Sequence, residues 1–145
     1  MALLSPQDRE TVSRHLSVIV HPVRILFFTQ TFGAPDSVVV AKQVIDEVVS
    51  LSDTISLEEV NFVLDKERAA AYGVMDIPAI ALLRNNDEDT RMRFLGAPAG
   101  YEFMSLIEAI ILAGTDDSGL TPASKELIAS KVTAPLDLQV FVTPT

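Results

Sequence analysis

Few side chains in this sequence could take part in catalysis or metal binding, and none of them is a cysteine thiol. The chain has no cysteine, which excludes disulfides, thiolate metal sites, iron–sulfur clusters and thiol nucleophiles, because each needs a sulfur as ligand or attacking atom. The two histidines, His15 and His21, lie six residues apart without a carboxylate spaced to complete a metal site. The acidic run 87–89 lacks the spaced ligands of a calcium loop. The sequence therefore predicts no metal and no cofactor.

One hydroxyl could be considered as a nucleophile. Ser37 follows Asp36, but no base stands beside it in the sequence. A serine hydroxyl has a far higher pKa than a thiol and needs such a base to attack. We expect Ser37 to be the N-cap of a helix instead, because its oxygen can accept a bond from an unpaired helix amide.

The composition sets further limits. The chain has 145 residues, of which 48% are hydrophobic, so it can bury a core without disulfides or metals. Its net charge is -9, whereas nucleic-acid binding needs clustered lysines and arginines. No apolar run reaches the roughly 18 residues that span a bilayer. We expect a cytoplasmic protein that binds neither nucleic acid nor a membrane.

The N-terminal part predicts a helix followed by a buried strand. Ser5 and Pro6 suit the cap and the first residue of the helix. His21-Pro22 should end it, because the residue before a proline is pushed out of the helical region. The run 23–29 (VRILFFT) is almost all apolar or β-favouring, which is typical of a central strand buried on both faces.

The middle of the chain predicts the remaining elements of an α/β domain. Glu58-Glu59 interrupts the alternation of one strand and predicts an irregularity there, and Gly114 should stop the last helix. The resulting order is βαβ, then α, then ββα. The predicted elements are a turn over 30–36, a helix over 37–51, a strand over 55–63, a helix over 65–71, two hairpin strands over 79–83 and 91–94, and a helix over 101–113.

The C-terminal part predicts a polar linker over 115–120, a helix over 121–131 and a strand over 137–142. Comparison within the chain shows a helix, a proline and a β-favouring run in both 11–31 and 124–145. Two interpretations stay open. Either a second copy of the unit begins here and breaks off after its first strand, or an ordinary helix and edge strand close one domain.

The order of elements, with a proline just before the third strand, resembles the thioredoxin fold. The segment 94–103 (FLGAPAGYEF) is similar to the first unit of the two-unit glutaredoxin-like protein disulfide oxidoreductases. It is also similar to the N-terminal domain of the flavoprotein subunit of alkyl hydroperoxide reductase. Both families place two thioredoxin-like units in tandem. The resemblance covers the whole chain and implies an α/β, thioredoxin-like fold (βαβ-α-ββα) with an extra N-terminal helix and a C-terminal helix plus strand.

The resemblance also divides the chain. Residues 1–114 would be a thioredoxin-like unit without Cys-x-x-Cys, 115–120 a linker, and 121–145 the first helix and strand of a truncated second unit. In these families Cys-x-x-Cys directly follows a strand like 140–145 (VFVTPT). We therefore expect the active dithiol to lie outside this chain.

In a thioredoxin-like unit the redox motif lies between the first strand and the next helix. The string Ala34-Pro35-Asp36-Ser37 aligns with it, so Ala34 and Ser37 are the degenerate dithiol positions. The resemblance also implies a cis peptide bond before Pro78, opposite this turn. The expected groove for a substrate or partner consists of Phe32, Pro35, Asp36, Ile77 and Pro78. The alternative is a turn that survives only because the fold needs it.

These features predict a redox-inactive scaffold half of a protein disulfide oxidoreductase, a class that serves thiol–disulfide exchange and cell redox homeostasis. The alternative is a stand-alone, non-enzymatic adaptor that binds a peptide or protein in the Pro78 groove. Glu102 is expected to face the second unit's thiols and modulate their pKa, or only to stabilise its own helix N-terminus. The strand 138–142 would leave an apolar edge, so pairing with its own sheet or a homodimer is expected.

Overall fold

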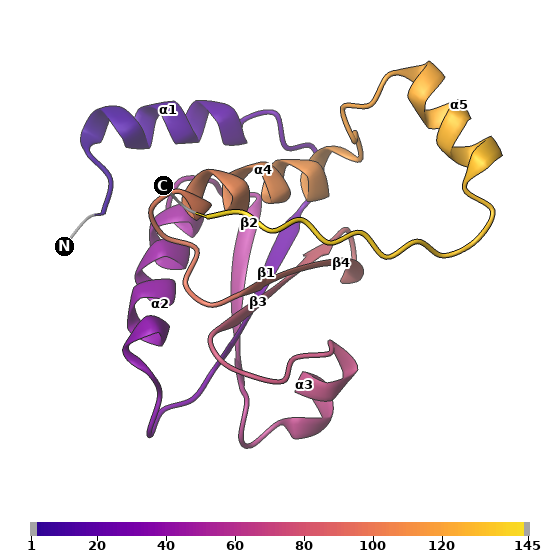
Figure 1. The fold of residues 1–145 in the computed structure, drawn as a ribbon. Helices are drawn as coiled ribbons and strands as arrows, with labels where there is room; N and C mark the ends of the chain where they lie inside the picture. Colours follow the sequence, from indigo (N-terminus) through magenta and orange to yellow (C-terminus); the bar gives the residue numbers. More distant parts are fainter. Residues whose placement is uncertain (1–2, 144–145) are drawn as a thin grey trace. The chain divides into compact units, whose positions relative to one another are not determined.

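The computed structural model describes residues 3–143, and the chain divides into two compact units, Met1–Thr115 (unit 1) and Asp116–Thr145 (unit 2). Unit 1 holds the sheet. Its elements are α1 (Pro6–Leu16), β1 (Val23–Thr29), α2 (Asp36–Val49), β2 (Ile55–Asn61), α3 (Lys66–Ala71), β3 (Ala79–Arg84), β4 (Glu88–Leu95) and α4 (Glu102–Thr115) (Figure 1).

The sheet has four strands in the order β2-β1-β3-β4. β1 pairs with β2 in parallel and with β3 in antiparallel orientation, and β3 pairs with β4 in antiparallel orientation. A parallel pair needs a crossover connection, which α2 supplies. The βαβ-α-ββα order predicted from the sequence is therefore confirmed, with α1 as the extra N-terminal helix.

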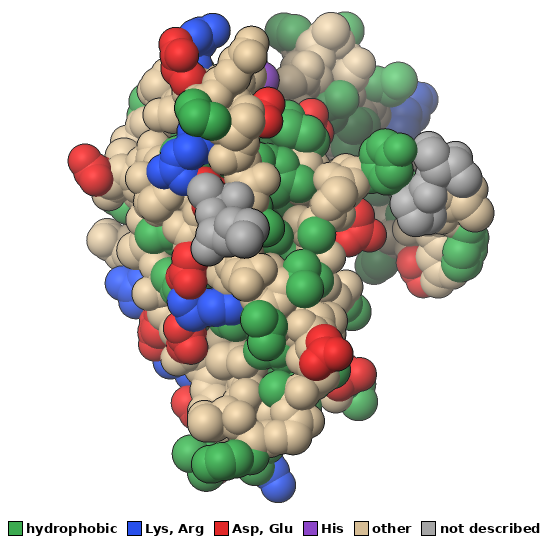
Figure 2. Space-filling model, turned by 90° about the vertical axis from the view of Figure 1, so that its left-hand side faces the viewer, with side chains coloured by type: hydrophobic (Ala, Val, Ile, Leu, Met, Phe, Trp, Pro, Cys, Tyr) green, Lys and Arg blue, Asp and Glu red, His purple; other side chains and the backbone are tan. Residues whose placement is uncertain are grey.

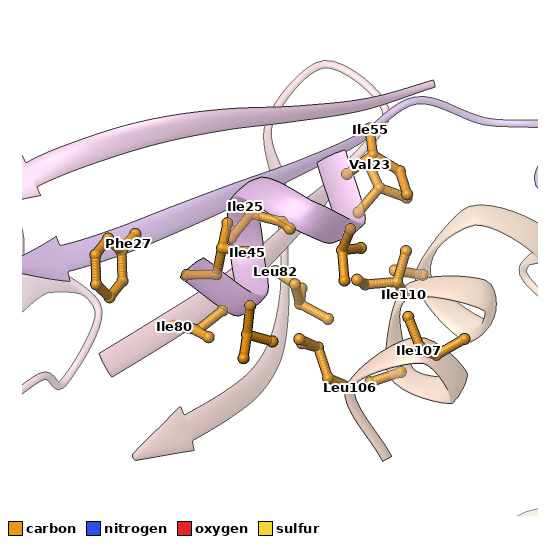
Figure 3. Packing of buried hydrophobic residues seen from close by; sticks show 14 of the residues in the cluster. Val23, Ile25, Phe27, Ile45, Ile55, Ile80, Leu82, Leu106, Ile107 and Ile110 are labelled. Carbon is orange, nitrogen blue, oxygen red and sulfur yellow. The ribbon is translucent and has the colours of Figure 1, made fainter. Parts of the chain in front are cut away.

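β1 lies inside the sheet and is buried on both faces. Val23, Ile25 and Phe27 belong to a cluster that also contains residues of α1, α2 and α4 (Figure 3). Leu26 and Phe28 point the other way, into a second cluster that includes a residue of α3. The two sets alternate because successive strand side chains point to opposite faces. Burial of each such side chain stabilises the fold by about 1.5–3 kcal/mol.

α1 ends earlier than the sequence predicts. The predicted stop was His21-Pro22, but the last helical residue is Leu16. The chain leaves the helix because the amides of Val20 and His21 both donate to the carbonyl oxygen of Gly114, at 3.1 and 3.0 Å. Ile19 remains buried in this connection at 8% exposure. A contact with α4, remote in sequence, thus decides where α1 ends.

Gly114 is not the helix stop that the sequence predicts. It lies inside α4, which continues through Thr115. A Cβ atom built on Gly114 would lie 2.6 Å from Cγ2 of Ile19. Ile19 cannot swing away cheaply, because a β-branched side chain is stiff at its first torsion. Glycine is therefore needed for the close approach of the α1–β1 connection.

We predict that Gly114→Ala lowers the free energy of unfolding by about 1–3 kcal/mol, because the added methyl overpacks the contact with Ile19. Urea denaturation measures this change. The loss should shrink in an Ile19→Ala background, where the clashing Cγ atoms are gone. Alanine otherwise favours a helix over glycine by about 1 kcal/mol, so a stabilised Gly114→Ala protein would contradict the packing argument.

β2 carries two adjacent carboxylates without any break. Its register with β1 is continuous from Val23↔Ile55 to Thr29↔Asn61, so the irregularity predicted at Glu58-Glu59 is wrong. Each carboxylate has a cationic partner instead: Arg68 and Arg24 contact Glu58, and Lys42 contacts Glu59. The hydrogen bond from Arg68 is the main cause that lowers the pKa of Glu58. Paired charges explain why the alternation is interrupted on an edge strand.

The predicted hairpin of β3 and β4 is confirmed, with a longer second strand. β4 begins at Glu88 rather than at residue 91, so the turn is shorter than predicted. Asn85 and Asp87 take positive φ values of 40° and 66°, which asparagine and aspartate tolerate better than most residues. The register shifts between Ala81 and Leu83. The short helix α3 is also confirmed, with Asp65 as its N-cap.

Within its described residues, unit 2 contains one helix, α5 (Pro122–Lys131). The strand predicted over 137–142 is wrong, because the structure assigns no helix or strand to these residues. A strand exists only where its backbone groups pair with a neighbour, and no such pairing is found in the described residues. The end of the predicted second unit, 144–145, lies outside the described residues. Between residues 3 and 143, no helix combines the length and the apolar character needed to cross a membrane.

Candidate functional site

The candidate site lies where β1 ends and α2 begins. β1 ends at Thr29, and residues 30–35 lead to the first helical residue, Asp36. Gly33 has a φ of 68°, the left-handed region that favours glycine. Pro35 is the N-cap of α2, with extended backbone and without a side-chain cap bond. The central strand and α2 therefore fix both ends of this turn.

Of the aligned dithiol positions, Ala34 lies in this turn and Ser37 in the first turn of α2, and neither side chain carries a thiol. Ala34 is half-buried and packs against the main hydrophobic cluster. Ser37 is the second residue of α2 and is half-buried. Its predicted role as N-cap is wrong, because the helix begins one residue earlier and Pro35 holds the cap position. Dithiol exchange needs a thiolate, so this turn cannot carry it out.

The peptide bond between Ile77 and Pro78 is cis. The register of β1 and β3 pairs Phe28 with Ala79, so Pro78 lies beside the end of β1. Pro78 itself is buried, and its carbonyl oxygen accepts the amide of Gly96 at 2.8 Å. Ile77 is half-buried against the same cluster as Ala34. Ala34 and Ile77 therefore both lie at the end of the sheet where β1 leads into α2, and both pack against the main hydrophobic cluster.

Phe32, one of the five predicted groove residues, is 89% exposed. Pro35 and Asp36 are exposed as well. Phe32 borders a hollow that opens toward β2 rather than toward Pro78. The hollow is lined by Gln30, Thr31, Phe32, Asn61, Val63 and Leu64.

Sequence reasoning missed the β2 side of this hollow. The strands β1 and β2 are parallel, so their ends meet at one edge of the sheet. β2 stops two residues earlier than predicted, because Oδ1 of Asn61 accepts the amides of Val63 and Leu64, both at 3.0 Å. This turn leaves Leu64 84% exposed. The β1–α2 connection and the β2–α3 connection both lie at the lower end of the molecule in Figure 1. Figure 2 shows hydrophobic side chains at this end. The predicted βαβ order implies that β1 and β2 are parallel. That order was the sequence signal that could have placed the residues after β2 beside those after β1.

The remaining predicted residues lie apart from this turn. Glu102 is the first residue of α4 and is exposed. His15 is exposed on α1, and His21 is half-buried after it. Within the described residues, no group of three or more histidine and acidic side chains is arranged to hold a metal ion.

The comparisons with known proteins identify the family. A "Probable Thioredoxin" from Methanothermobacter thermautotrophicus is 38% identical over 71 residues, which cover 48% of this chain and 73% of that protein. The chain belongs to the thioredoxin family. No protein-family model matches the chain.

Two solved structures confirm the thioredoxin-like fold. The NTD_N/C domain of the alkylhydroperoxide reductase AhpF from Enterococcus faecalis has a TM-score of 0.79 and 22% identity, over 88% of this chain and 60% of that one. A protein disulfide oxidoreductase from Aeropyrum pernix K1 has a TM-score of 0.73 and 24% identity, over 87% of this chain and 54% of that one. The thioredoxin-family chain thus spans little more than half the length of these two proteins.

We predict that Ser37→Ala changes the free energy of unfolding by less than about 0.5 kcal/mol, because Ser37 caps no helix amide. The matched variant is Ser5→Ala. The Ser5 hydroxyl accepts the amide of Asp8 at 3.2 Å, and its loss should cost about 1 kcal/mol. Urea denaturation of both variants measures the difference. An equal loss in the two proteins would show that Ser37 has a structural role at the α2 N-terminus after all.

Proposed function

We propose that this chain is a redox-inactive thioredoxin-like unit that serves as the scaffold half of a protein disulfide oxidoreductase, whose active dithiol lies on a second unit. One observation carries the proposal. A thioredoxin-family unit has the β1–α2 turn and the cis Ile77-Pro78 bond, yet Ala34 and Ser37 occupy the positions aligned with the dithiol. Without a thiolate the unit cannot exchange disulfides, so its contribution is a surface.

The structural relatives support the oxidoreductase context. Their names describe an alkylhydroperoxide reductase and a protein disulfide oxidoreductase, and this chain matches only part of each. A unit that packs against an active partner needs a stable core and exposed side chains that can contact the partner. Unit 1 has both, since its two buried clusters hold the sheet while Phe32 and Leu64 remain exposed.

A second candidate is a stand-alone adaptor that binds a polypeptide without chemistry. The hollow at the ends of β1 and β2 favours it, because Phe32, Val63 and Leu64 line it with apolar surface. Apolar patches of this kind often mark interaction sites. The adaptor function predicts that the chain binds a free polypeptide, whereas the scaffold proposal does not require such binding.

Insulin reduction by dithiothreitol tests the proposal. The full chain should not raise the rate above that of dithiothreitol alone, while a thioredoxin with an intact dithiol should. A faster rate would contradict a redox-inactive unit. The adaptor function instead predicts binding of the released insulin B chain without faster reduction. Phe32→Ser should then abolish binding, and Val18→Ser, which changes an exposed valine in the α1–β1 connection, should not.

Glu102 has a specific part in the scaffold proposal. Its carboxylate is exposed in the first turn of α4, and a negative charge that faces a thiol raises the pKa of that thiol by disfavouring the thiolate. In a protein that carries both units, Glu102→Gln should therefore lower the thiol pKa, as measured by the pH dependence of alkylation. Glu108→Gln, an exposed change on the same helix, is the matched control. An unchanged thiol pKa in Glu102→Gln would remove this role.

A further inference from the structure

The two faces of the sheet in unit 1 are covered very differently. α1, α2 and α4 pack on one face, whereas α3 and the connection that follows it cover the other (Figure 1). We call residues 65–76 the lid: they comprise the N-cap of α3, the helix itself and most of the connection to β3. α3 is only six residues long, and isolated helices of this length are not stable in water. The lid therefore depends on its contacts with the sheet.

The lid buries few side chains. Two of its residues are buried, Ala69 and Val74, at 2% and 5% exposure. Tyr72 is half-buried, with its ring centroid 5.9 Å from that of Phe28. By contrast, α2 alone buries five residues. Because hydrophobic stabilisation is roughly proportional to the apolar area removed from water, the lid is held less strongly than the helices on the other face.

The first of two arginine contacts holds the lid from within. Arg68 lies on α3, and its guanidinium donates to Oε1 of Glu58 on β2 at 2.5 Å. Arg24 of β1 donates to the other oxygen of the same carboxylate at 3.3 Å. Glu58 keeps this second partner if the lid moves away, so opening breaks one charged contact without leaving the carboxylate unpaired.

The second arginine contact holds the lid from the sheet. Nε of Arg93, on β4, donates to the carbonyl oxygen of Tyr72 at 3.0 Å, and its Cζ lies 5.3 Å from the centroid of the Tyr72 ring. The terminal nitrogens donate to both carboxylate oxygens of Asp89 at 2.8 and 2.7 Å. This two-point contact orients the guanidinium. Arg93 is therefore fixed on β4 and grips the lid beyond the end of α3.

The lid covers a strip of apolar side chains on the sheet. Leu26 and Phe28 of β1 and Val60 of β2 are 0%, 0% and 2% exposed and belong to the same cluster as Ala69 and Val74. The pairing of β1 with β2 and β3 uses backbone groups of the strands alone. The sheet and the helices on its other face can therefore persist when the lid leaves.

We propose that residues 65–76 open as a unit and uncover Leu26, Phe28 and Val60 while α1, α2 and α4 stay folded, with Arg68 and Arg93 as the latches. Segments with few buried apolar contacts are where local opening occurs. The inference goes beyond the proposed function, because it needs neither a second unit nor a bound polypeptide. Opening also frees the connection that leads directly to Ile77-Pro78, so the lid links the cover of this sheet face to the predicted groove.

Thiol labelling tests the lid, because the chain has no cysteine of its own. Val74→Cys places one thiol under the lid, and Val48→Cys, at a 0% exposed valine of α2, is the matched control. We expect an aromatic disulfide reagent to label Val74→Cys about a hundredfold faster, after each rate is divided by the rate in the urea-unfolded protein. Urea should also accelerate it less, since local opening exposes less surface than global unfolding. Equal rates with equal urea dependence would overturn the proposal.

Two arginine variants separate the latch from general stability. Arg93→Met should speed the labelling of Val74→Cys about tenfold, because it removes the donor to Tyr72 and the cation over its ring. Arg9→Met removes an ion pair with Glu47 that joins α1 to α2. It should speed the labelling of Val48→Cys and leave that of Val74→Cys unchanged. Equal acceleration of Val74→Cys by both variants would show that no separate opening exists.

Amide hydrogen exchange in the unsubstituted chain gives the same information without an introduced thiol. The amides of Ala69, Tyr72 and Val74 donate to carbonyl oxygens within the lid, at 3.1, 3.2 and 2.9 Å. If the lid opens as a unit, all three share one opening constant, equal to the one obtained from Val74→Cys. Three different constants would show that the segment frays residue by residue and would overturn the lid.

Discussion

The structure of unit 1 depends on the burial of β1 on both faces and along both edges. Its odd-numbered apolar residues face α1, α2 and α4, and Leu26 and Phe28 face α3. A strand in this position can be neither shifted nor exposed, because a one-residue slip exchanges the two faces. The elements around it adjust instead. α1 ends at Leu16, and the connection from α1 to β1 then donates hydrogen bonds to the carbonyl oxygen of Gly114 in α4. The connection can come this close because glycine has no Cβ atom to clash with Ile19.

The same constraint places the candidate site. Because β1 and β2 are parallel, the turn after β1 and the turn after β2 lie at one edge of the sheet, and cis Pro78 directly precedes the neighbouring β3. In a thioredoxin-family protein this edge is where a thiolate would act. Here Ala34 joins the core and Ser37 lies within α2. The same end of the sheet has an apolar hollow beside Phe32 and Leu64.

Unit 2 repeats part of the sequence pattern of α1 and β1. Unit 2 has a hydroxyl N-cap followed by a proline, as α1 has, and apolar residues at the first, third and fifth positions after Pro135, as β1 has after Pro22. In unit 1 these features produce a buried helix and a strand, because a sheet and α4 receive them. In unit 2 the helix forms, since its cap and hydrogen bonds are local, whereas the strand does not. Helix hydrogen bonds close within a segment, and strand hydrogen bonds require another segment.

Local sequence patterns specified the strand VRILFFT, the helix start at Ser5-Pro6 and the βαβ-α-ββα order, and the composition established the absence of any thiol. These depend on local periodicity, capping and composition. The tertiary structure set the end of α1, the paired charges of Glu58 and the hollow beside β2. It also decided that 137–142 is not a strand. Each of these depends on residues distant in the chain, and local sequence does not specify where those residues lie.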